Sequence, residues 1–231
     1  MAKIGIVVAM DEEREAVQNL LKEKEIEQIY NLKFIIGKIE NKECVIVKSG
    51  VGKVNAARTT QVLIDNFELE CIINVGAAGA INYLLNIGDV VIAKHVVQHD
   101  FDITAFGHSK GYISGIGDRI ECDLGLTNAF ENMIKSKEEK NYNVKMGIVA
   151  SGDIFCTSIE MKNKINAKFN ADVVDMECAS IAQVAYLDNI PFISIRCISD
   201  IPNKNNASDF DANLELASKR CAILLREFCS K

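Results

Sequence analysis

Two acidic side chains stand out because each follows a short apolar run that is typical of a buried strand. Glu177 comes soon after Val173–Val174, and a helical-looking segment then leads to the second run. Asp200 comes soon after that second run, Phe192–Cys197. In open α/β sheets, ligands bind in the crevice beyond the carboxyl ends of parallel strands. Residues 172–200 are therefore a candidate active site, although Glu177 could instead be a helix-start acid and Asp200 a turn residue.

A third acidic position follows the apolar run of residues 3–9, where Glu12 and Glu13 open a predicted helix. On spacing alone we favour the plainer interpretation, in which these acids interact with the helix dipole, worth about 0.3–1 kcal/mol at an exposed site. The alternative is that one of them points over the strand end as a general base. If the three strands are neighbours, which the sequence does not show, their acids meet in one crevice. Such a cluster can divide acid and base roles, because neighbouring carboxylates push their pKa values apart.

Other patterns that could bind a ligand are weaker. His95 and His99 suit one face of a strand, but a structural or hydrogen-bonded pair is favoured over a metal site. The glycine-rich segment 49–53 lacks the P-loop spacing, and segment 76–79 lacks the dinucleotide-binding fingerprint. Both segments follow predicted strands, so close approach of a ligand and a plain tight turn are equally favoured.

The composition is that of one large globular domain, which we place at residues 1–231. The chain is 48% hydrophobic and 25% charged, and it is long enough to bury a core without disulfides or metal. Its net charge of −6 disfavours nucleic-acid and anionic-membrane surfaces, which need a basic patch. No apolar run reaches about 18 residues, and acids interrupt the N-terminal run before it resembles a secretory signal. We expect a cytoplasmic protein whose cysteines are free thiols, because none has C-x-x-C or metal-ligand spacing.

Strand and helix patterns alternate along the chain, which predicts an α/β fold with a mostly parallel or mixed sheet. The predicted strands are residues 3–9, 33–38, 43–48, 71–75, 89–97, 144–150, 173–174 and 192–197. Four helices are predicted at residues 10–23, 54–66, 123–135 and 210–228, the first with Asp11 as its N-cap. A further helix is predicted to begin at a capping box formed by Thr157 and Glu160. Residues 76–79 are predicted to form a turn, 99–120 a long functional loop, and 137–140 a solvated charge run.

Seven motifs, in order and at matching spacings, resemble one enzyme family. They are AMDEE (9–13), SGVGKVNAA (49–57), NVGAAG (74–79), DITAFG (102–107), SGDIF (151–155), DMECASIA (175–182) and RCISD (196–200). Together they closely resemble the bacterial 5′-methylthioadenosine/S-adenosylhomocysteine nucleosidases of the nucleoside phosphorylase superfamily, nearly from end to end. The family implies a single α/β domain around a central mixed β-sheet, partly barrel-like and flanked by helices. It also implies a homodimer.

The activity that this resemblance implies is irreversible hydrolysis of the bond between adenine N9 and ribose C1′, with no metal or organic cofactor. The substrates would be 5′-methylthioadenosine and S-adenosylhomocysteine, and also 5′-deoxyadenosine, in methionine salvage and S-adenosylhomocysteine removal. By the same resemblance, Asp200 would protonate adenine N7, Glu13 would be the general base on the attacking water, and Glu177 would bind the ribose hydroxyls. A carboxylate acid and a carboxylate base suit the oxocarbenium-like charge that forms on the sugar.

The other site residues are carried over from the same resemblance. Met176 would lie against the ribose, Phe155 would stack on adenine, and the Cys156 backbone would hold the purine edge. Met10 and Val51 would lie beside the 5′-alkylthio group, and Ile103 and Phe106 would complete that pocket from the partner subunit. Arg196 would lie near the acids, without an assigned role. Three positions depart from the family: Ala77 replaces a common Ser, His108 a common Tyr, and Cys156 an aliphatic residue. These departures bear on the preference between the methylthio and homocysteinyl substrates.

Three other functions stay open. A phosphorolytic relative would need basic groups for phosphate, whereas the AMDEE segment places carboxylates there. A futalosine-type hydrolase would differ in its substrate. A non-catalytic nucleoside-binding protein would bind without turnover, which the presence of all three acids disfavours.

Overall fold

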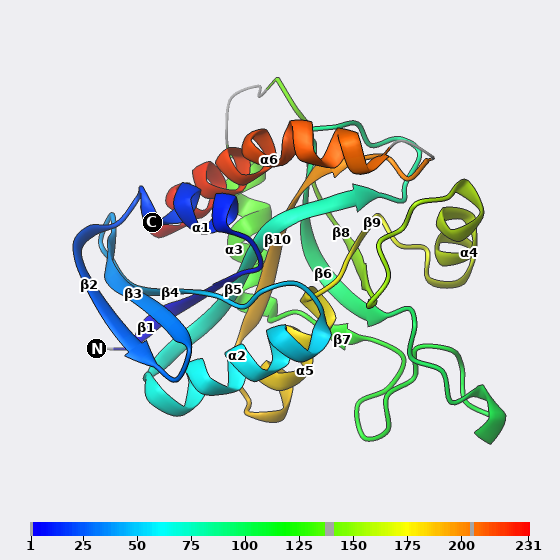
Figure 1. Ribbon diagram of the computed structural model, residues 1–231, viewed down its shortest axis with the longest axis horizontal. Coiled ribbons are helices and arrows are strands. Elements are labelled where there is room, and N and C mark those ends of the chain that lie inside the picture. The colour runs from blue at the N-terminus through cyan, green and yellow to red at the C-terminus, as the bar shows by residue number, and fades with distance from the viewer. Residues whose placement is uncertain (1, 137–140, 204–205) are drawn as a thin grey trace.

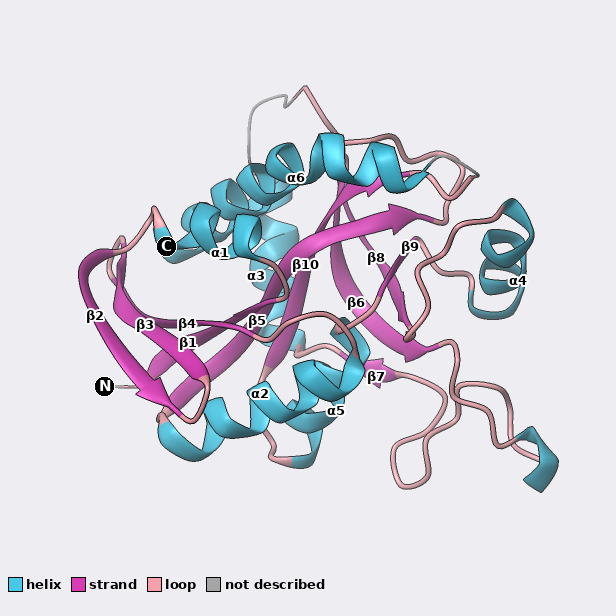
Figure 2. Cartoon of the chain, in the orientation of Figure 1, coloured by secondary structure: helices cyan, strands magenta, loops and turns pink. Residues whose placement is uncertain are grey.

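One mixed sheet of ten strands runs through the molecule and carries helices on both sides (Figures 1 and 2). The computed structural model describes residues 2–136, 141–203 and 206–231. The strands are β1 (Lys3–Val8), β2 (Lys22–Ile29), β3 (Leu32–Ile39), β4 (Lys42–Lys48), β5 (Leu69–Ala80), β6 (Val90–Gln98), β7 (Ile120–Glu121), β8 (Val144–Ser151), β9 (Val173–Asp175) and β10 (Phe192–Asp200). The helices are α1 (Asp11–Gln18), α2 (Lys53–Asn66), α3 (Leu124–Lys135), α4 (Ile159–Phe169), α5 (Cys178–Leu187) and α6 (Asn206–Cys229), with a 3-10 turn η1 at Thr104–Phe106. On one side of the sheet α1 packs along α6, and on the other α2 packs along α5.

Five of the strands close into a ring, which makes the sheet partly barrel-like as the family resemblance implied. Their order is β10-β6-β8-β9-β5, and β10 pairs back onto β5. The long strand β5 pairs in parallel with β1 and β10 and antiparallel with β9. The sheet then continues from β1 through β4 and β3 to β2. The three strands that precede the acids are therefore all neighbours of β5, which the sequence alone did not show.

Strand β5 continues through residues 76–79, where we predicted a turn. These residues pair with 196–200 of β10, so the prediction was wrong. The small residues serve close packing instead of chain reversal. A Cβ atom on Gly76 would lie 2.5 Å from Arg196 Nη1 and 2.6 Å from Glu13 Oε1. Glycine at this position leaves room for two charged side chains against the strand.

The first helix is shorter than predicted, and a strand that we did not predict follows it. Helix α1 ends at Gln18 instead of residue 23, and its N-cap is Met10 instead of Asp11. Strand β2, with the sequence KEKEIEQI, pairs with β3 at the edge of the sheet, and its side chains are almost all exposed. Charged residues are common on edge strands because they discourage further pairing, but they remove the apolar alternation that indicates a strand.

Smaller corrections concern the ends of elements. Strand β10 runs to Asp200 instead of residue 197, so this acid is the last residue of the strand. Helix α4 begins after Ser158, whose hydroxyl accepts the Met161 N–H, and not after Thr157. The other predicted strands, α2 and α3 are confirmed at or near their predicted bounds. The predicted charge run at 137–140 lies outside the described residues.

Helix α2 lies directly against β1. Leu63 of α2 is fully buried, and a Cβ atom on Gly5 of β1 would lie 3.0 Å from its Cδ2 atom. The absence of a side chain at Gly5 therefore lets the helix approach the strand. No helix in the described parts of the chain is long and apolar enough to span a membrane.

We expect Leu63→Ala to lower the free energy of unfolding by about 2–5 kcal/mol, because it removes buried contacts and leaves a cavity. Urea denaturation followed by circular dichroism measures the change. The matched control is Ile26→Ala. The Ile26 side chain is an isomer of the leucine side chain, but it lies on β2 and is 64% exposed. It should change stability by less than about 0.5 kcal/mol. Equal losses in the two variants would contradict the packing of α2 against β1.

Candidate active site

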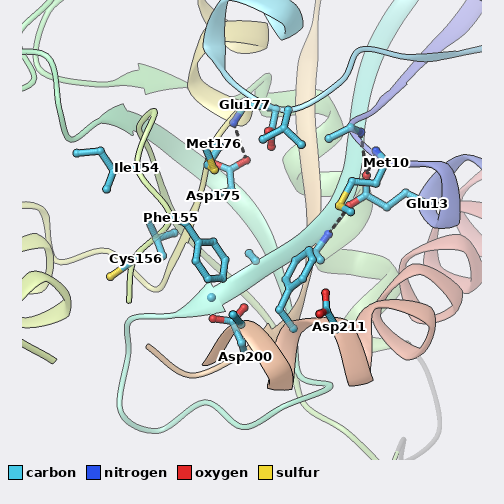
Figure 3. A pocket seen from close by; sticks show the side chains of 18 residues that line it. Met10, Glu13, Ile154, Phe155, Cys156, Asp175, Met176, Glu177, Asp200 and Asp211 are labelled. Atoms are coloured by element: carbon cyan, nitrogen blue, oxygen red, sulfur yellow. Dashed lines mark hydrogen bonds between the residues drawn. The ribbon is translucent and has the colours of Figure 1, made fainter. Parts of the chain in front are cut away.

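A cavity of about 320 Å³ opens where β1, β9 and β10 end around β5 (Figure 3). Most of the residues that the sequence singled out line it. They are Met10, Glu13, Val51, Ala77, Phe155, Cys156, Met176, Glu177 and Asp200. The lining also includes residues that we did not predict, among them Ile154, Asp175, Phe210 and Asp211.

Glu13 lies at the inner end of the cavity and is only 2% exposed. Its Oε2 atom accepts the N–H groups of Ala9 and Met10 at 2.8 and 3.0 Å, and its Oε1 atom accepts the Ala77 N–H at 2.9 Å. Burial raises the pKa of Glu13, while the Arg196 guanidinium and the three N–H groups oppose that rise. A carboxylate that is firmly held and has a raised pKa is suited to accept a proton near neutral pH.

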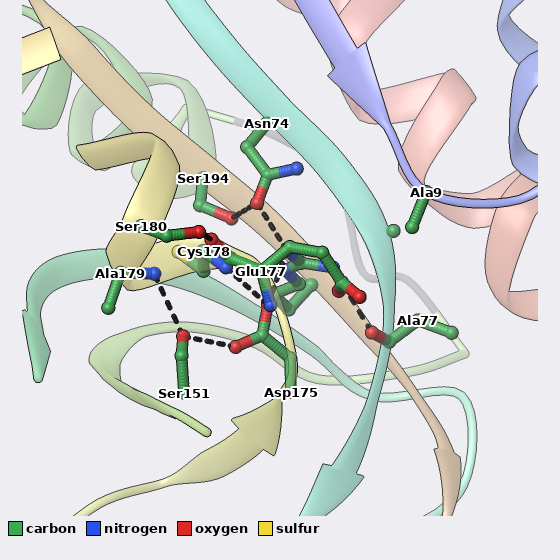
Figure 4. A network of polar contacts seen from close by, with 12 residues as sticks. Ala9, Asn74, Ala77, Ser151, Asp175, Glu177, Cys178, Ala179, Ser180 and Ser194 are labelled. Carbon is green, nitrogen blue, oxygen red and sulfur yellow. Dashed lines mark hydrogen bonds and ion pairs between the residues drawn. The ribbon is translucent and has the colours of Figure 1, made fainter. Parts of the chain in front are cut away.

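Arg196 is 1% exposed, does not line the cavity, and belongs to a buried polar network with Asp175, which Figure 4 labels. It forms an ion pair with Asp175 at 2.5 Å, donates to the side chain of Asn74, and donates to the Ala77 carbonyl at 3.3 Å. Burial works against the guanidinium charge, but the surrounding acids, led by Asp175, outweigh it and raise the pKa of Arg196. The cation is therefore permanent.

Asp175 is the shared partner in this network. Its carboxylate accepts the Ser151 hydroxyl and, at 2.9 Å, the Cys178 N–H at the start of α5. The Ser151 hydroxyl in turn accepts the Ala179 N–H at 2.8 Å. The network thus fixes the first turn of α5, and with it Glu177, the N-cap residue of that helix.

Glu177 and Asp200 occupy different surroundings in the same cavity. Glu177 accepts the Gly52 N–H at 2.9 Å, and burial, followed by the nearby Asp175 charge, raises its pKa to about 7. Asp200 accepts the Ser199 hydroxyl and the Asn206 amide, each at 2.8 Å. Burial also raises the pKa of Asp200, and these two hydrogen bonds oppose the rise. Both acids can therefore carry a proton at a higher pH than an exposed carboxyl.

An aromatic and backbone wall faces Asp200. Phe155 packs edge-to-face on Phe210 of α6, with ring centroids 5.8 Å apart. The Cys156 carbonyl accepts the Asn206 amide at 2.8 Å, and the same Asn206 amide group binds Asp200. Asn206 therefore fixes the acid relative to the wall, so that a flat ring against Phe155 would lie beside Asp200.

Some predicted residues lie elsewhere. Ile103 and Phe106 are absent from the lining of this cavity. They belong to the η1 segment, which projects at the lower right of Figure 1. The side chain of Phe106 is 81% exposed. His95 lies beside Glu121 across the β6–β7 pair, and His99 is buried. Within the described residues, no cluster of three His, Cys, Asp or Glu side chains is arranged to hold a metal.

The residues that sequence reasoning missed differ in whether any signal could have found them. Asp175 ends the strand before Glu177, so the same strand-end argument applies to it. Phe210 and Asp211 come from α6, where the apolar pattern indicates only a core-facing helix and assigns Phe210 to the core. Asn206 acts through hydrogen bonds to Asp200 and Cys156 that no local pattern indicates.

The pKa of Glu177 has a consequence for stability that a Glu177→Gln variant should reveal. Because its pKa rises from 4.5 to about 7 on folding, the folded protein holds this proton more tightly than the unfolded chain. The resulting stabilisation is complete below pH 4.5 and is lost as pH rises to about 7. We therefore expect the Tm of the variant, relative to wild type, to rise over this range and to level off above it.

Thermal unfolding at half-unit pH steps measures this difference. Glu12→Gln, the same substitution at an exposed position on α1, controls for the change of side chain itself. A Tm difference for Glu177→Gln that stays constant between pH 4.5 and 7 would contradict the raised pKa.

Comparison with known proteins places this geometry in a family. Residues 3–230 match the model of the phosphorylase superfamily. The 5′-methylthioadenosine/S-adenosylhomocysteine nucleosidase of Bacillus cytotoxicus is 38% identical over 217 residues, which are 94% of this chain and 93% of that protein. The nucleosidase of the same name from Neisseria meningitidis, solved with methylthio-immucillin-A, has a TM-score of 0.95 at 31% identity and covers 100% of this chain and 99% of its own. Futalosine hydrolase of Helicobacter pylori has a TM-score of 0.92 at 33% identity, covering 98% of this chain and 97% of its own. The chain belongs to the phosphorylase superfamily and, within it, to the 5′-methylthioadenosine/S-adenosylhomocysteine nucleosidases.

Proposed function

We propose that this nucleosidase hydrolyses 5′-methylthioadenosine and S-adenosylhomocysteine, and also 5′-deoxyadenosine, through a division of labour among Asp200, Glu13 and Glu177. The observation that carries this proposal is the meeting of three buried acids in one cavity with three different sets of hydrogen-bond partners. Such differences let similar carboxyl groups serve as acid, base and binding group.

In the proposed reaction, the bond between N9 and C1′ breaks and its electron pair stays with adenine. Asp200 donates a proton to N7, which neutralises the leaving base. Its raised pKa supports this role, because a general acid must still hold its proton near neutral pH. Phe155 holds the adenine ring, and the Cys156 backbone holds the purine edge, next to the acid that Asn206 positions.

On the opposite side of the sugar, a water molecule adds to C1′ and gives its proton to Glu13. The three N–H groups on Glu13 hold the carboxylate in one orientation, and Arg196 favours its ionised form. Glu177 binds the ribose hydroxyls, and Met176 lies against the ribose. Ala77 contributes its backbone N–H to Glu13, which any residue except proline would supply at this position. The replacement of a common Ser therefore leaves the contact with the base intact.

Met10 and Val51 form the apolar wall for the 5′-alkylthio group. An apolar pocket favours sulfur over a hydroxyl but rejects the hydroxyl only modestly, so adenosine should be a poor substrate. We further propose a cytoplasmic homodimer of single-domain chains, in which Ile103 and Phe106 complete this wall in the partner subunit. The 81% exposure of Phe106, a large apolar side chain, supports a covered position in the assembly.

The charge of the cavity favours water over phosphate as the nucleophile. Five carboxyl side chains contribute to its lining: Glu13, Asp175, Glu177, Asp200 and Asp211. Among the described residues that line it, there is no lysine, arginine or histidine. Arg196 does not line the cavity and is already paired with Asp175. A phosphate dianion would therefore enter a negative field without a free cation to bind it.

We expect purified protein to release adenine from methylthioadenosine and S-adenosylhomocysteine at a rate that added phosphate does not change. Release of the free purine base, adenine or hypoxanthine, is followed by chromatography for these two substrates, 5′-deoxyadenosine, adenosine, inosine and futalosine in turn. A strict requirement for phosphate would contradict hydrolysis. Futalosine is included because the futalosine hydrolase of Helicobacter pylori has a similar fold. Faster cleavage of futalosine than of methylthioadenosine would favour that second activity.

We expect Asp200→Asn and Glu13→Gln each to lower kcat by roughly 10²–10⁴-fold, the usual contribution of a general acid or base. Both substitutions keep the size of the side chain, so the variants should fold. Adenine release and far-UV circular dichroism are measured together. Asp209→Asn, a nearby exchange on α6 outside the cavity lining, is the control. Near-wild-type turnover in either variant would remove its proposed role.

A further inference from the structure

Three loops around the cavity are joined by a closed cycle of hydrogen bonds, which we call the Lys53 ring (Lys53, Asp100 and Asp153). The Lys53 ammonium donates to Asp100 Oδ1 at 2.7 Å. Asp100 Oδ2 accepts the Asp153 N–H at 2.9 Å. Asp153 Oδ1 accepts the Lys53 N–H at 2.7 Å, which closes the cycle. The three residues follow β4, β6 and β8, so the ring links the ends of three different strands.

Lys53 and Asp153 are each close in the chain to residues that line the cavity, and Asp100 precedes the η1 segment. Lys53 directly follows Val51 and Gly52, and Gly52 donates its N–H to Glu177. Asp153 directly precedes Ile154 and Phe155, which line the cavity. Asp100 begins the segment that leads to Ile103 and η1. The ring therefore ties together the loop that holds Glu177, the aromatic wall, and the start of the long loop.

The backbone around the ring is built to permit it. Gly50 and Gly52 have φ values of 85° and 97°, a region that side-chain-bearing residues avoid. A Cβ atom on Gly52 would lie 3.2 Å from Asp153 Oδ1, and one on Gly152 would lie 3.0 Å from Asp100 Cγ. The side chains of Lys53 and Asp100 are each only 18% exposed, so water screens their ion pair less than it would at the surface.

Lys53 has a further anchor away from the cavity. Its ammonium also donates to Gln98 Oε1 at 3.0 Å, and the Gln98 amide donates to Gln183 of α5 at 2.5 Å. Burial acts to raise the pKa of Asp100, but the hydrogen bonds from the Lys53 ammonium and the Asp153 N–H outweigh it, so the pKa is lowered. The ring is thus held by a charged pair at neutral pH and is joined to the helix that begins at Glu177.

We propose that Lys53 is a positioning residue, which acts through the ring to hold the Gly52 N–H against Glu177 and Val51 against the 5′ substituent. Lys53 itself does not line the cavity. The inference rests on the proposed function, since Glu177 and Val51 are the groups whose contacts with the substrate it controls. Its loss should weaken substrate binding more than it slows the proton transfers at Asp200 and Glu13.

The test compares steady-state kinetics of Lys53→Met, Lys53→Arg, Asp100→Asn and the double variant Lys53→Met/Asp100→Asn on methylthioadenosine. Lys53→Met and Asp100→Asn should each lower kcat/KM by about ten- to hundredfold, the size expected for a charge-assisted hydrogen bond, mainly through a higher KM. Lys53→Arg keeps the charge and should recover much of the loss. The double variant should be no worse than the worse single variant, because one break already opens the ring.

Lys48→Met is the matched control. Lys48 ends β4, shortly before Lys53 in the chain, and makes a Lys–Asp contact of the same length, 2.7 Å to Asp11, but its side chain is 36% exposed. It should leave kcat/KM unchanged. Asp100→Asn keeps the shape of the site and decides the matter if Lys53→Met does not fold.

Several results would overturn the inference. They are wild-type kcat/KM in Lys53→Met, additive losses in the double variant, an equal loss in Lys48→Met, or a fall in kcat at unchanged KM. Failure of the proposed function is distinguishable, because a wild-type protein that releases no adenine contradicts the function itself. A wild type that releases adenine at the same kcat/KM as Lys53→Met contradicts only the role of Lys53.

Discussion

The buried guanidinium of Arg196 is the charge on which the candidate active site depends. Glu13 and Glu177 both have raised pKa values even though Arg196 lowers them, since burial is the larger effect at each acid. Without this cation, the balance would move further toward protonated carboxyl groups, and Glu13 would lose the ionised form that a general base needs. Asp175 pairs with Arg196 and so keeps the cation in place while leaving Glu13 free for chemistry. The arrangement lets several acids share a small volume.

Strand β5 makes this crowding of charge sterically possible. Gly76 lies beneath Glu13 and Arg196, and a Cβ atom on Gly79 would lie 3.2 Å from Asp200 Oδ2. The proposed base and the proposed acid therefore each face a glycine, and the two glycines are three residues apart on one strand. Between them, Ala77 binds Glu13 through its N–H and Arg196 through its carbonyl. The backbone of β5 serves as part of the site, and the side chains of residues 76–80 are small so that the backbone can be reached.

The fold was more predictable from the sequence than the site. The buried strand β1 carries a continuous apolar run, so its pattern is local and strong. Strand β2 could not be predicted, because its exposed, charged side chains suit the edge of a sheet and lack the apolar pattern of a strand in the core. The motif resemblance placed Glu13, Glu177 and Asp200 together, whereas spacing alone favoured a plainer role for Glu13. The Asn206–Cys156 hydrogen bond and the Lys53 ring join segments far apart in the sequence, and no local pattern indicates such contacts.

The residues proposed to act as base and acid come from opposite ends of the chain, and this has a consequence for how the protein becomes active. Glu13 follows β1 and Asp200 ends β10, and both strands must pair with β5 before the two side chains face one cavity. During synthesis, β1 can pair with β4 and β5 early, but β10 leaves the ribosome near the end. A nascent or truncated chain that lacks β10 therefore lacks the proposed acid and also Arg196, the cation that favours the ionised form of Glu13. Catalytic competence then arises only on completion of the five-strand ring, so activity reports on the integrity of the whole fold and not on one part of it.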